Sequence, residues 1–283
     1  MRITKGVIAA AGRGTRFLPS VKAMPKEMLP VVDKPIIQYI VEEFVAAGIE
    51  DIVVVTSWDH RSLEDHFDHS SELEEHLRRN GKLEMLGQVR KIADMANFIY
   101  IRQKGPYGNG TPCLNAKAVI GDQPFVYAFG DDLVLSKKSF TRSMLDSYSK
   151  KPGIYVGTQE VEKEEVQKYG IIEPRKPGSN EVKAIIEKPD AKSAPSNLAV
   201  FGRYILPPQI FEALEHTPLG KGKELWLADG VHRLISKGTK AYYKKVEGGQ
   251  WYTTGDPVSY LRAVRAFALA RPDYRDKVKD IFR

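Results

Sequence analysis

The N-terminal part of the chain combines glycines with positive charge in a short space. Residues 9–16 read AAAGRGTR directly after an apolar run, and Lys22 and Lys26 follow. Glycines allow a backbone to approach a phosphate closely and to present its N–H groups as donors. Arg16 and the two lysines suit a triphosphate, because the charge that develops on a leaving pyrophosphate must be neutralised. The stretch therefore predicts a site for a nucleoside triphosphate.

Three other interpretations of this loop have to be weighed. Two glycines alone would be typical of a tight strand-to-helix turn. A Rossmann loop, and with it a nicotinamide-dependent enzyme, would need a third glycine where Arg16 stands. A Walker loop would end in Gly-Lys-Ser or Gly-Lys-Thr, which this segment lacks. The clustered cations favour the phosphate-binding interpretation over a plain turn.

Polar residues at the ends of two further apolar runs could complete such a pocket. Asp131 and Asp132 follow the run Phe125–Phe129, and the C-terminal ends of parallel strands are where α/β sheets bind ligands. Aspartate is a natural ligand for Mg²⁺, but paired aspartates at a turn are commonly helix caps, and Asp132 is open to that interpretation. Gln103 also ends a strand-like run. Its amide can donate and accept hydrogen bonds at once, although a surface polar residue is the plainer interpretation.

The elements that would position these residues alternate in the first half of the chain. Apolar runs predict strands, helical spacing predicts helices between them, and Gly48 marks the expected end of one helix. The expected strands are Lys5–Ala10, Asp51–Thr56, 98–102 and Phe125–Phe129, and the expected helices are 36–45 and 112–119. Strand–helix–strand alternation predicts an α/β fold with a Rossmann-like, doubly wound sheet.

The second half has more strand-like runs, joined by polar turns that contain proline and glycine. The expected strands are Ile154–Glu160, 170–173, Val182–Glu187 and 199–206, and the expected helices are 208–215, 224–236 and 258–282 with a break at Pro272. These runs predict a mixed sheet with a smaller second subdomain. The charged stretch 62–96 is expected to be helical and partly exposed.

Length and composition exclude several classes of protein. A chain of 283 residues suffices for one large α/β domain, alone or with a smaller subdomain. No apolar run is long enough to span a membrane, and the run 6–11 is too short for a signal peptide, so we expect a cytoplasmic protein without a membrane partner. The single cysteine, Cys113, excludes an intrachain disulfide and is expected to be a packing residue.

The net charge of +7 is compatible with nucleic acid, with an anionic substrate or with a solvated basic surface. The basic residues are dispersed, apart from pairs such as Lys244 and Lys245, and no basic patch interleaved with aromatic residues stands out. This distribution favours a small polyanion, and we expect no nucleic-acid partner.

The loop and the segment after it resemble a known family. Gly12-x-Gly14-Thr15-Arg16, followed by residues 25–30 (PKEMLP), resembles the signature of sugar nucleotidylyltransferases. The longer match includes residues 32–35 (VDKP) and 37–39 (IQY), and it is similar to bacterial and archaeal UTP–glucose-1-phosphate uridylyltransferases. Family-like segments recur in the expected order along nearly the whole chain. The resemblance implies a glycosyltransferase-A-like nucleotidyltransferase fold, with 1–283 as a single domain of two halves, about 1–150 for the nucleotide and 151–283 for the sugar phosphate.

The resemblance also implies roles for the residues of the first half. Arg16 and Lys26 would bind and polarise the triphosphate, Gln103 would read the uracil edge, and Asp131 would hold Mg²⁺ (magnesium). The segment 108–111 (GNGT) corresponds to Gly-x-Gly-His in the family, so Thr111 is a departure. The implied nucleotide-binding residues are Ala10, Ala11, Gly12, Gly14, Thr15, Glu27, Gln103 and Gly108.

In the second half, residues 169–170, 186–189 and 195–199 match the sugar-binding segments of the family. Glu187 would accept hydrogen bonds from sugar hydroxyls, and Lys188 would hold the sugar phosphate. The implied sugar-phosphate-binding residues are Gly170, Glu187, Lys188 and Asn197. Thr253 is a departure, since it stands where the family has the aspartate of Asp-x-Gly, a second metal ligand. Asp256 could substitute for it or could cap the helix that begins at Pro257.

The activity that this resemblance implies is transfer of UMP from UTP to glucose-1-phosphate, which gives UDP-glucose and pyrophosphate. The same chemistry with dTTP or an N-acetylhexosamine-1-phosphate is an alternative, as is a non-catalytic nucleotide-sugar sensor. The resemblance further implies a homo-oligomer, either a dimer or a tetramer.

Overall fold

A computed structural model describes residues 2–281, and within them the longest strands form one nine-stranded sheet. Its first part is parallel, with β1 between β6 and β4, and β5 beyond β4. These four strands are β1 (Lys5–Ala10), β4 (Asp51–Thr56), β5 (Asn97–Arg102) and β6 (Phe125–Phe129). The near-continuous apolar runs of β1 and β4 are typical of parallel strands that are buried on both faces.

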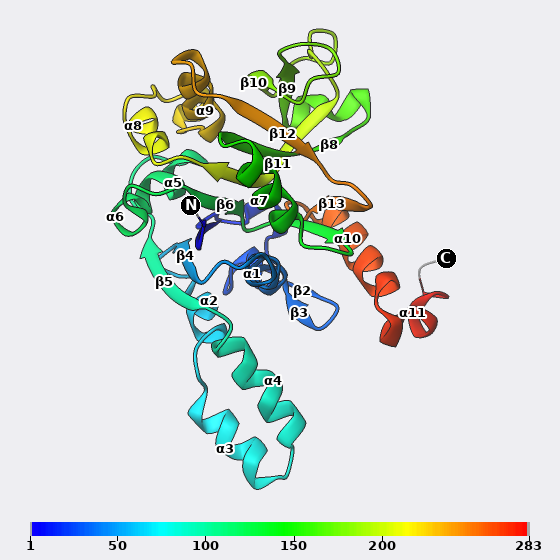
Figure 1. Cartoon of the computed structure of the whole chain (residues 1–283). Helices are drawn as coiled ribbons and strands as arrows, with labels where there is room; N and C mark the ends of the chain where they lie inside the picture. Colours follow the sequence, from blue (N-terminus) through cyan, green and yellow to red (C-terminus); the bar gives the residue numbers. More distant parts are fainter. Residues whose placement is uncertain (1, 282–283) are drawn as a thin grey trace.

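The sheet continues without a break into the second half of the chain (Figure 1). Strand β11 (Leu198–Leu206) runs antiparallel to β6, β8 and β9, and all nine of its residues are buried. The remaining strands are β8 (Ile154–Glu160), β9 (Gly170–Pro174), β10 (Val182–Glu187) and β12 (Ala241–Lys245). The predicted α/β fold with a doubly wound mixed sheet is confirmed.

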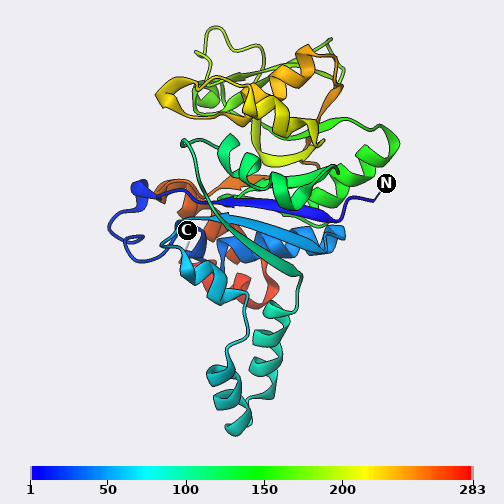
Figure 2. The same ribbon diagram turned by 90° about the vertical axis from the view of Figure 1, so that its left-hand side faces the viewer.

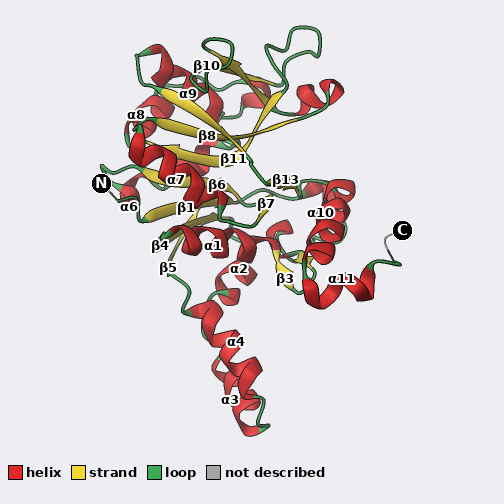
Figure 3. Ribbon diagram, turned by 45° about the vertical axis from the view of Figure 1, so that its right-hand side comes forward, coloured by secondary structure: helices red, strands yellow, loops and turns green. Residues whose placement is uncertain are grey.

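Helices cover both faces of this sheet and bury a core on each (Figure 3). Alternate residues of one strand face opposite cores: Ile8 of β1 packs with α1 and α7, whereas Val7 packs with α5, α8 and α9. The helices are α1 (Ile36–Ala47), α5 (Gly110–Asn115), α6 (Lys117–Ile120), α7 (Phe140–Lys150), α8 (Gln209–Glu215) and α9 (Leu227–Ser236). Gly48 ends α1 in a left-handed conformation, as predicted. Cys113 is buried in the second core, which confirms its predicted packing role.

A small antiparallel sheet that sequence patterns did not predict lies beside the large one. It pairs β7 (Asp132–Ser136) with β13 (Gly249–Thr253), so that Thr253 lies opposite Asp132. Helices α10 (Pro257–Ala270) and α11 (Pro272–Val278) follow. The predicted break at Pro272 is confirmed, and residue 282, the predicted end of this helical stretch, lies outside the described residues. Minor elements are β2 (Pro30–Val31), β3 (Lys34–Pro35) and the 3₁₀ turns Thr15–Phe17, Lys26–Met28, Lys163–Lys168 and Lys221–Lys223.

The charged stretch 62–96 is helical, as predicted, but it is divided into α2 (Arg61–His66), α3 (Ser71–Arg79) and α4 (Leu83–Ala93). Helices α3 and α4 form a hairpin that projects from the body of the molecule (Figures 1 and 2). Its surface carries ion pairs, such as the one between Arg90 and Glu74 at 2.7 Å. None of the helices within residues 2–281 is both long and apolar enough to cross a membrane.

Candidate active site

The glycine loop after β1 folds back against Lys26. Gly14 has a φ of 60°, a left-handed conformation that strains most side chains. A Cβ on Gly14 would lie 3.1 Å from Val21 Cγ2 and 3.4 Å from Lys26 Cβ, and one on Gly12 would lie 3.8 Å from Lys26 Cε. The two glycines therefore let the loop backbone and the Lys26 side chain lie next to each other.

Lys26 reaches Asp131 across the ends of β1 and β6 and forms a direct ion pair with it. Gly130, the residue before Asp131, packs closely on the end of β1: its N–H donates to Ala9 O at 2.9 Å, and a Cβ at this position would lie 2.8 Å from the same oxygen. The side chains of Lys26 and Asp131 are 16% and 23% exposed. Burial acts to lower the pKa of Lys26, but the carboxylates of Asp131 and Glu27 outweigh burial and hold the pKa above its ordinary value.

Glu27 is buried beside this pair, and its Oε2 has no hydrogen-bond partner among the described residues. Its Oε1 lies 4.0 Å from Lys26 Nζ. Burial raises the pKa of Glu27 to about 7; the positive charge of Lys26 opposes the shift, and the negative charge of Asp131 adds to it. A carboxyl group with such a pKa is close to half-protonated at neutral pH.

A cavity of about 270 Å³, called the nucleotide cavity from here on, opens beside the Lys26–Asp131 pair. It brings together most residues for which the sequence predicted nucleotide or metal binding. Those that line it are Ala11, Gly12, Lys26, Glu27, Gln103, Gly108 and Asp131. The cavity lies at the C-terminal ends of parallel strands, as expected for a ligand site in an α/β sheet.

Three predicted nucleotide-binding residues are not in the lining of this cavity: Ala10, Gly14 and Thr15. Ala10 is the last residue of β1, and its carbonyl oxygen lies 2.9 Å from Nδ1 of the buried His60. Because a carbonyl only accepts, Nδ1 of His60 carries the proton. Gly14 and Thr15 begin the 3₁₀ turn that leads to Arg16. These residues shape the loop.

The opposite wall of the nucleotide cavity is fixed by Leu225. The Leu225 carbonyl accepts from Gly110 N at 2.9 Å, and a Cβ on Gly108 would lie 2.2 Å from the same oxygen. Only glycine can occupy position 108 in this packing. Gln103 extends β5, its N–H donating to Thr56 O at 2.8 Å. Thr111, the departure from the family pattern, is buried and is not among the residues that line the cavity.

A larger cavity of about 790 Å³ lies between the end of β8 and the segment after it on one side, and β13 and the start of α10 on the other. Its lining includes Arg16, Lys188, Thr253 and Gly255. A Cβ on Gly255 would lie 3.3 Å from Asp131 Oδ2, 3.4 Å from Thr253 Oγ1 and 3.6 Å from Arg16 Nη1. The two cavities therefore adjoin near Gly255, because Asp131, which lines the nucleotide cavity, and Arg16, which lines the larger one, both lie beside this residue. Lys22, the third cation near the glycine loop, is exposed and is in neither lining.

The end of β10 brings Glu187 and Lys188 toward Trp226. Lys188 Nζ lies 4.6 Å from the centroid of the Trp226 ring and 3.8 Å from Glu187 Oε1. Burial raises the pKa of Glu187, against the opposing charge of Lys188. Gly170 pairs with Glu187 across β9 and β10, and a Cβ there would lie 3.1 Å from Glu187 Oε2. Sequence reasoning assigned no role to Trp226, because its contact with Lys188 depends on the packing of α9 beside β10.

Asn197, also predicted to bind the sugar phosphate, is placed elsewhere. Its Nδ2 donates to Val161 O at 3.4 Å, and it lines a separate cavity of about 500 Å³. The lining of that cavity, as far as residues 2–281 describe it, does not include Glu187 or Lys188.

Asp256 is a helix cap, as one of the two sequence interpretations held. Its Oδ1 accepts from Val258 N and Ser259 N, both at 3.0 Å, at the start of α10. Burial acts to raise the pKa of Asp256, but these hydrogen bonds outweigh burial and lower it. Thr253 instead lies close to Asp131, because the pairing of β13 with β7 brings the two strand ends together.

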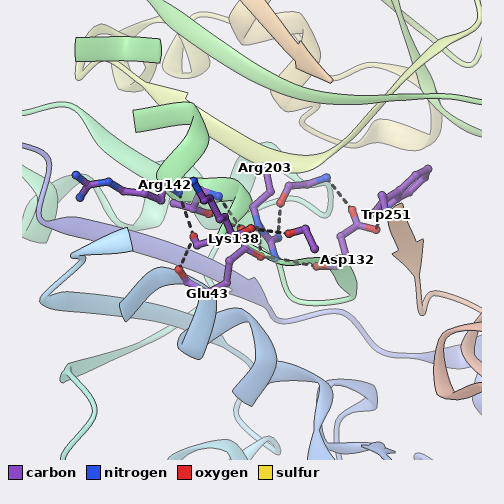
Figure 4. Close-up of polar contacts among 10 residues, drawn as sticks. Glu43, Asp132, Lys138, Arg142, Arg203 and Trp251 are labelled. Atoms are coloured by element: carbon purple, nitrogen blue, oxygen red, sulfur yellow. Dashed lines mark hydrogen bonds and ion pairs between the residues drawn. The ribbon is translucent and has the colours of Figure 1, made fainter. Parts of the chain in front are cut away.

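Asp132, in contrast, caps no helix. Its carboxylate accepts from Gly202 N at 2.7 Å and from Trp251 Nε1 at 2.8 Å, and so it joins β7 to β11 and β13. Arg203, which is fully buried, donates to Asp132 O at 2.9 Å and pairs with Glu43 at 2.8 Å (Figure 4). This buried network fixes the backbone next to Asp131.

Comparison with known proteins agrees with this geometry. Residues 5–269 match the family described as nucleotidyl transferase. The chain belongs to the nucleotidyl transferase family. Nucleotidyltransferases of this family generally use a divalent metal ion.

Within that family, the chain groups with the UTP–glucose-1-phosphate uridylyltransferases. It is 44% identical to such an enzyme of Bacillus subtilis (strain 168) over 279 residues, which are 98% of this chain and 95% of the relative. A solved UDP-glucose pyrophosphorylase in complex with UDP-glucose is 41% identical, with a TM-score of 0.85 over 95% of this chain and all of the other. The UTP-bound enzyme from Acinetobacter baumannii is 35% identical, with a TM-score of 0.90 over 99% of each chain.

Proposed function

We propose that the protein transfers UMP from UTP to glucose-1-phosphate, which gives UDP-glucose and pyrophosphate. The observation that carries the proposal is the meeting of the two cavities at Gly255, between Arg16 and Asp131. A triphosphate in the nucleotide cavity would place its phosphates next to an acceptor phosphate in the larger one. The likeness to uridylyltransferases over almost the full length of the chain supports this choice of reaction.

The reaction is a direct, in-line phosphoryl substitution. A phosphate oxygen of glucose-1-phosphate attacks the α-phosphorus of UTP and forms a new P–O bond. The bond between the α-phosphorus and the bridging oxygen to the β-phosphorus breaks, and pyrophosphate leaves with that electron pair. Since the attacking oxygen is already an anion, no general base is required, and the protein has to position the phosphates and neutralise their charge.

The charged residues divide this work between the two substrates. Lys26 and Arg16 neutralise the charge that develops on the leaving pyrophosphate. Lys188, at the rim of the larger cavity, holds the phosphate of the sugar. Glu187 accepts hydrogen bonds from sugar hydroxyls, and Gln103 donates to and accepts from the uracil edge.

Asp131 would hold Mg²⁺. Residues 2–281 contain no group of three or more His, Cys, Asp or Glu side chains placed to hold a metal ion. A single carboxylate at the junction of the cavities still fits Mg²⁺, which takes one or two carboxylates and completes its shell with water and substrate phosphates. When bound, the ion would supply further neutralisation of phosphate charge. Thr253 Oγ1 lies beside Gly255, as Asp131 does, and it would be a neutral and therefore weaker metal ligand than a carboxylate.

Pyrophosphate release, measured over a grid of nucleotides and sugar phosphates, tests the proposal. UTP with glucose-1-phosphate should give the highest kcat/KM in the grid, and release should require Mg²⁺. A higher kcat/KM with dTTP or with an N-acetylhexosamine-1-phosphate would overturn the substrate assignment but not the class of reaction. Binding of UDP-glucose without release from any pair would establish the sensor instead.

We also propose that the chain acts as a single domain and forms a homo-oligomer in solution. Light scattering coupled to size-exclusion chromatography measures the mass of the assembly. A mass near 31.8 kDa, that of one chain, at micromolar concentration would contradict the oligomer.

A further inference from the structure

Three loops begin at the edge of the sheet where the nucleotide cavity lies, and the first and third of them contribute residues to its lining. They follow β1, β4 and β5, which are neighbouring parallel strands whose C-terminal ends lie at one edge of the sheet. Arg13, in the first loop, lies with its guanidinium carbon 5.0 Å from the centroid of the Tyr107 ring in the third. This cation–π contact, called the Arg13–Tyr107 pair below, connects the glycine loop to the opposite wall of the cavity.

Tyr107 is held in place through its backbone and not by burial of its ring. It is 51% exposed, yet it lines the nucleotide cavity. Its carbonyl accepts from Leu225 N at 2.8 Å, and Gly108, the next residue, is locked against Leu225 O. A large aromatic ring is thus kept at the mouth of a cavity although it gains little from packing there, which is the arrangement of a ligand-binding side chain.

The middle loop supports Arg13 from another side. Burial acts to raise the pKa of Asp59, but hydrogen bonds from Ser57 and from its own N–H, together with the charges of His60 and Arg13, hold it low. Asp59 is therefore ionised near neutral pH and attracts the guanidinium of Arg13. His60, which follows it, is hydrogen-bonded to Ala10 O at the start of the glycine loop. The negative charge of Asp59 therefore favours the position of the Arg13 charge, and His60 fixes the middle loop to the start of the glycine loop.

We propose that Tyr107 is a further nucleotide-binding residue and that Arg13 positions its ring. The Tyr107 ring forms a wall of the nucleotide cavity and stacks on the nucleoside, and Arg13, which is not among the lining residues, holds the ring through the cation–π contact. Stacking of an aromatic ring on a base depends little on the identity of the base, so the pair strengthens nucleotide binding without selecting uracil. Neither residue lines the larger cavity, so the sugar phosphate is not affected. This inference rests on the proposed function, which places the nucleotide in this cavity.

Calorimetric titration with UTP, in the absence of sugar phosphate so that no turnover occurs, tests the pair. Tyr107→Leu should raise the Kd for UTP about tenfold, since base stacking on an aromatic ring is worth that much. Arg13→Ala should raise it about threefold, as for an exposed cation–π contact. Tyr107→Phe, which keeps the ring, should stay within about twofold of wild type. The double variant should be about as weak as Tyr107→Leu alone, because without the ring Arg13 has nothing to hold.

A matched control is available at the start of α11, where the guanidinium carbon of Arg271 lies 4.7 Å from the centroid of the Tyr274 ring. Tyr274 lines neither cavity, and Tyr274→Leu should leave the Kd for UTP unchanged. The KM for glucose-1-phosphate should change in none of these variants, and equal melting temperatures exclude misfolding as the cause of weaker binding.

Two negative results are distinguishable. UTP binding of wild-type strength in Tyr107→Leu and Arg13→Ala would overturn the inference and leave the proposed function intact. Failure of the wild-type protein to bind UTP at all would overturn both.

Discussion

Lys26 and Asp131, 105 residues apart in the chain, form a direct ion pair at the junction of the two cavities. The pair joins the residue predicted to neutralise the triphosphate to the residue predicted to hold its metal ion. The positive charge of Lys26 is thus balanced by a carboxylate in this structure. In the proposed reaction, Lys26 would exchange that carboxylate for phosphate oxygens of the nucleotide.

Replacement of Lys26 by alanine should lower kcat by about 10²-fold, because one preorganised positive group is lost from the transition state. Steady-state pyrophosphate release measures it. Lys22→Ala is the control: this lysine is close in sequence but exposed and outside both cavities, and its loss should change kcat less than about twofold. A kcat within a few-fold of wild type for Lys26→Ala would contradict its assigned role.

Thr253→Asp should restore a second carboxylate beside Asp131 and tighten Mg²⁺ binding to the free protein. A neutral hydroxyl is a poorer ligand for a hard dication, and the substitution adds one negative charge to the site. Calorimetric titration with Mg²⁺ and the Mg²⁺ dependence of activity both report the change.

Asp131→Asn should abolish catalysis, because the proposed metal site would lose its one carboxylate. Unchanged Mg²⁺ dependence in Thr253→Asp, together with an active Asp131→Asn, would refute the metal site.

Glu187→Gln should act on the sugar side alone. Glutamine keeps the shape of the side chain but replaces a charged acceptor with a neutral one, so the KM for glucose-1-phosphate should rise more than the KM for UTP. Initial rates with each substrate varied in turn separate the two constants. Equal changes in both, or none, would show that Glu187 does not contact the sugar.

Asp256→Ala should cost about 1 kcal/mol of stability, because the first turn of α10 loses its cap. Asparagine caps nearly as well, so Asp256→Asn should stay close to wild type. Urea unfolding measures both variants. The Mg²⁺ requirement should be the same in all three proteins; a strong rise in either variant would mean that Asp256 binds the metal after all.

Glu27 makes stability depend on pH. Its pKa is raised from 4.5 to about 7 in the folded protein, so between these values the folded state holds the proton more tightly than the unfolded state. Its contribution is most favourable below about pH 4.5 and is lost as the pH rises through 7. Relative to Glu27→Gln, which cannot ionise, the wild type should lose on the order of 3 kcal/mol between pH 4.5 and pH 8. Calorimetric melting of both proteins over this range tests it, and a constant difference would contradict the raised pKa.

The strands of the large sheet could be predicted because each carries its own signal. The bounds of β1, β4, β6, β8 and β10 follow directly from apolar runs that end at turn residues. The β7–β13 pair left no such signal. Residues 249–253 read GQWYT, a short polar and aromatic run, and their pairing partner is set by the packing of distant segments. The proximity of Thr253 to Asp131 depends on that pairing and could not be predicted from either segment alone.

The residues of the candidate site also fall into those that could be predicted from the sequence and those that could not. Gly12, Gly14 and Lys26 could be proposed together because glycines and cations lie close to one another along the same short segment of the chain. Contacts between loops could not: Arg13 and Tyr107 come from separate loops, and each alone is typical of an ordinary surface residue. The interpretation of Asp132 as a helix cap was suggested by the paired aspartates at a turn. Its hydrogen-bond partners instead lie on β11 and β13, far away in the sequence.

Strand β11 limits how far the two sides of the large sheet can move relative to each other. Residues 203–206 pair with β6, and residues 198–200 together with Tyr204 and Ile205 pair with β8. A hinge between β6 and β8 would have to break backbone hydrogen bonds worth about 1 kcal/mol each, in a strand with no exposed residue. The sheet therefore resists bending between these two strands. Arg13, Arg16 and Tyr107 lie on segments outside the sheet, so a movement of these residues would break none of its strand pairing.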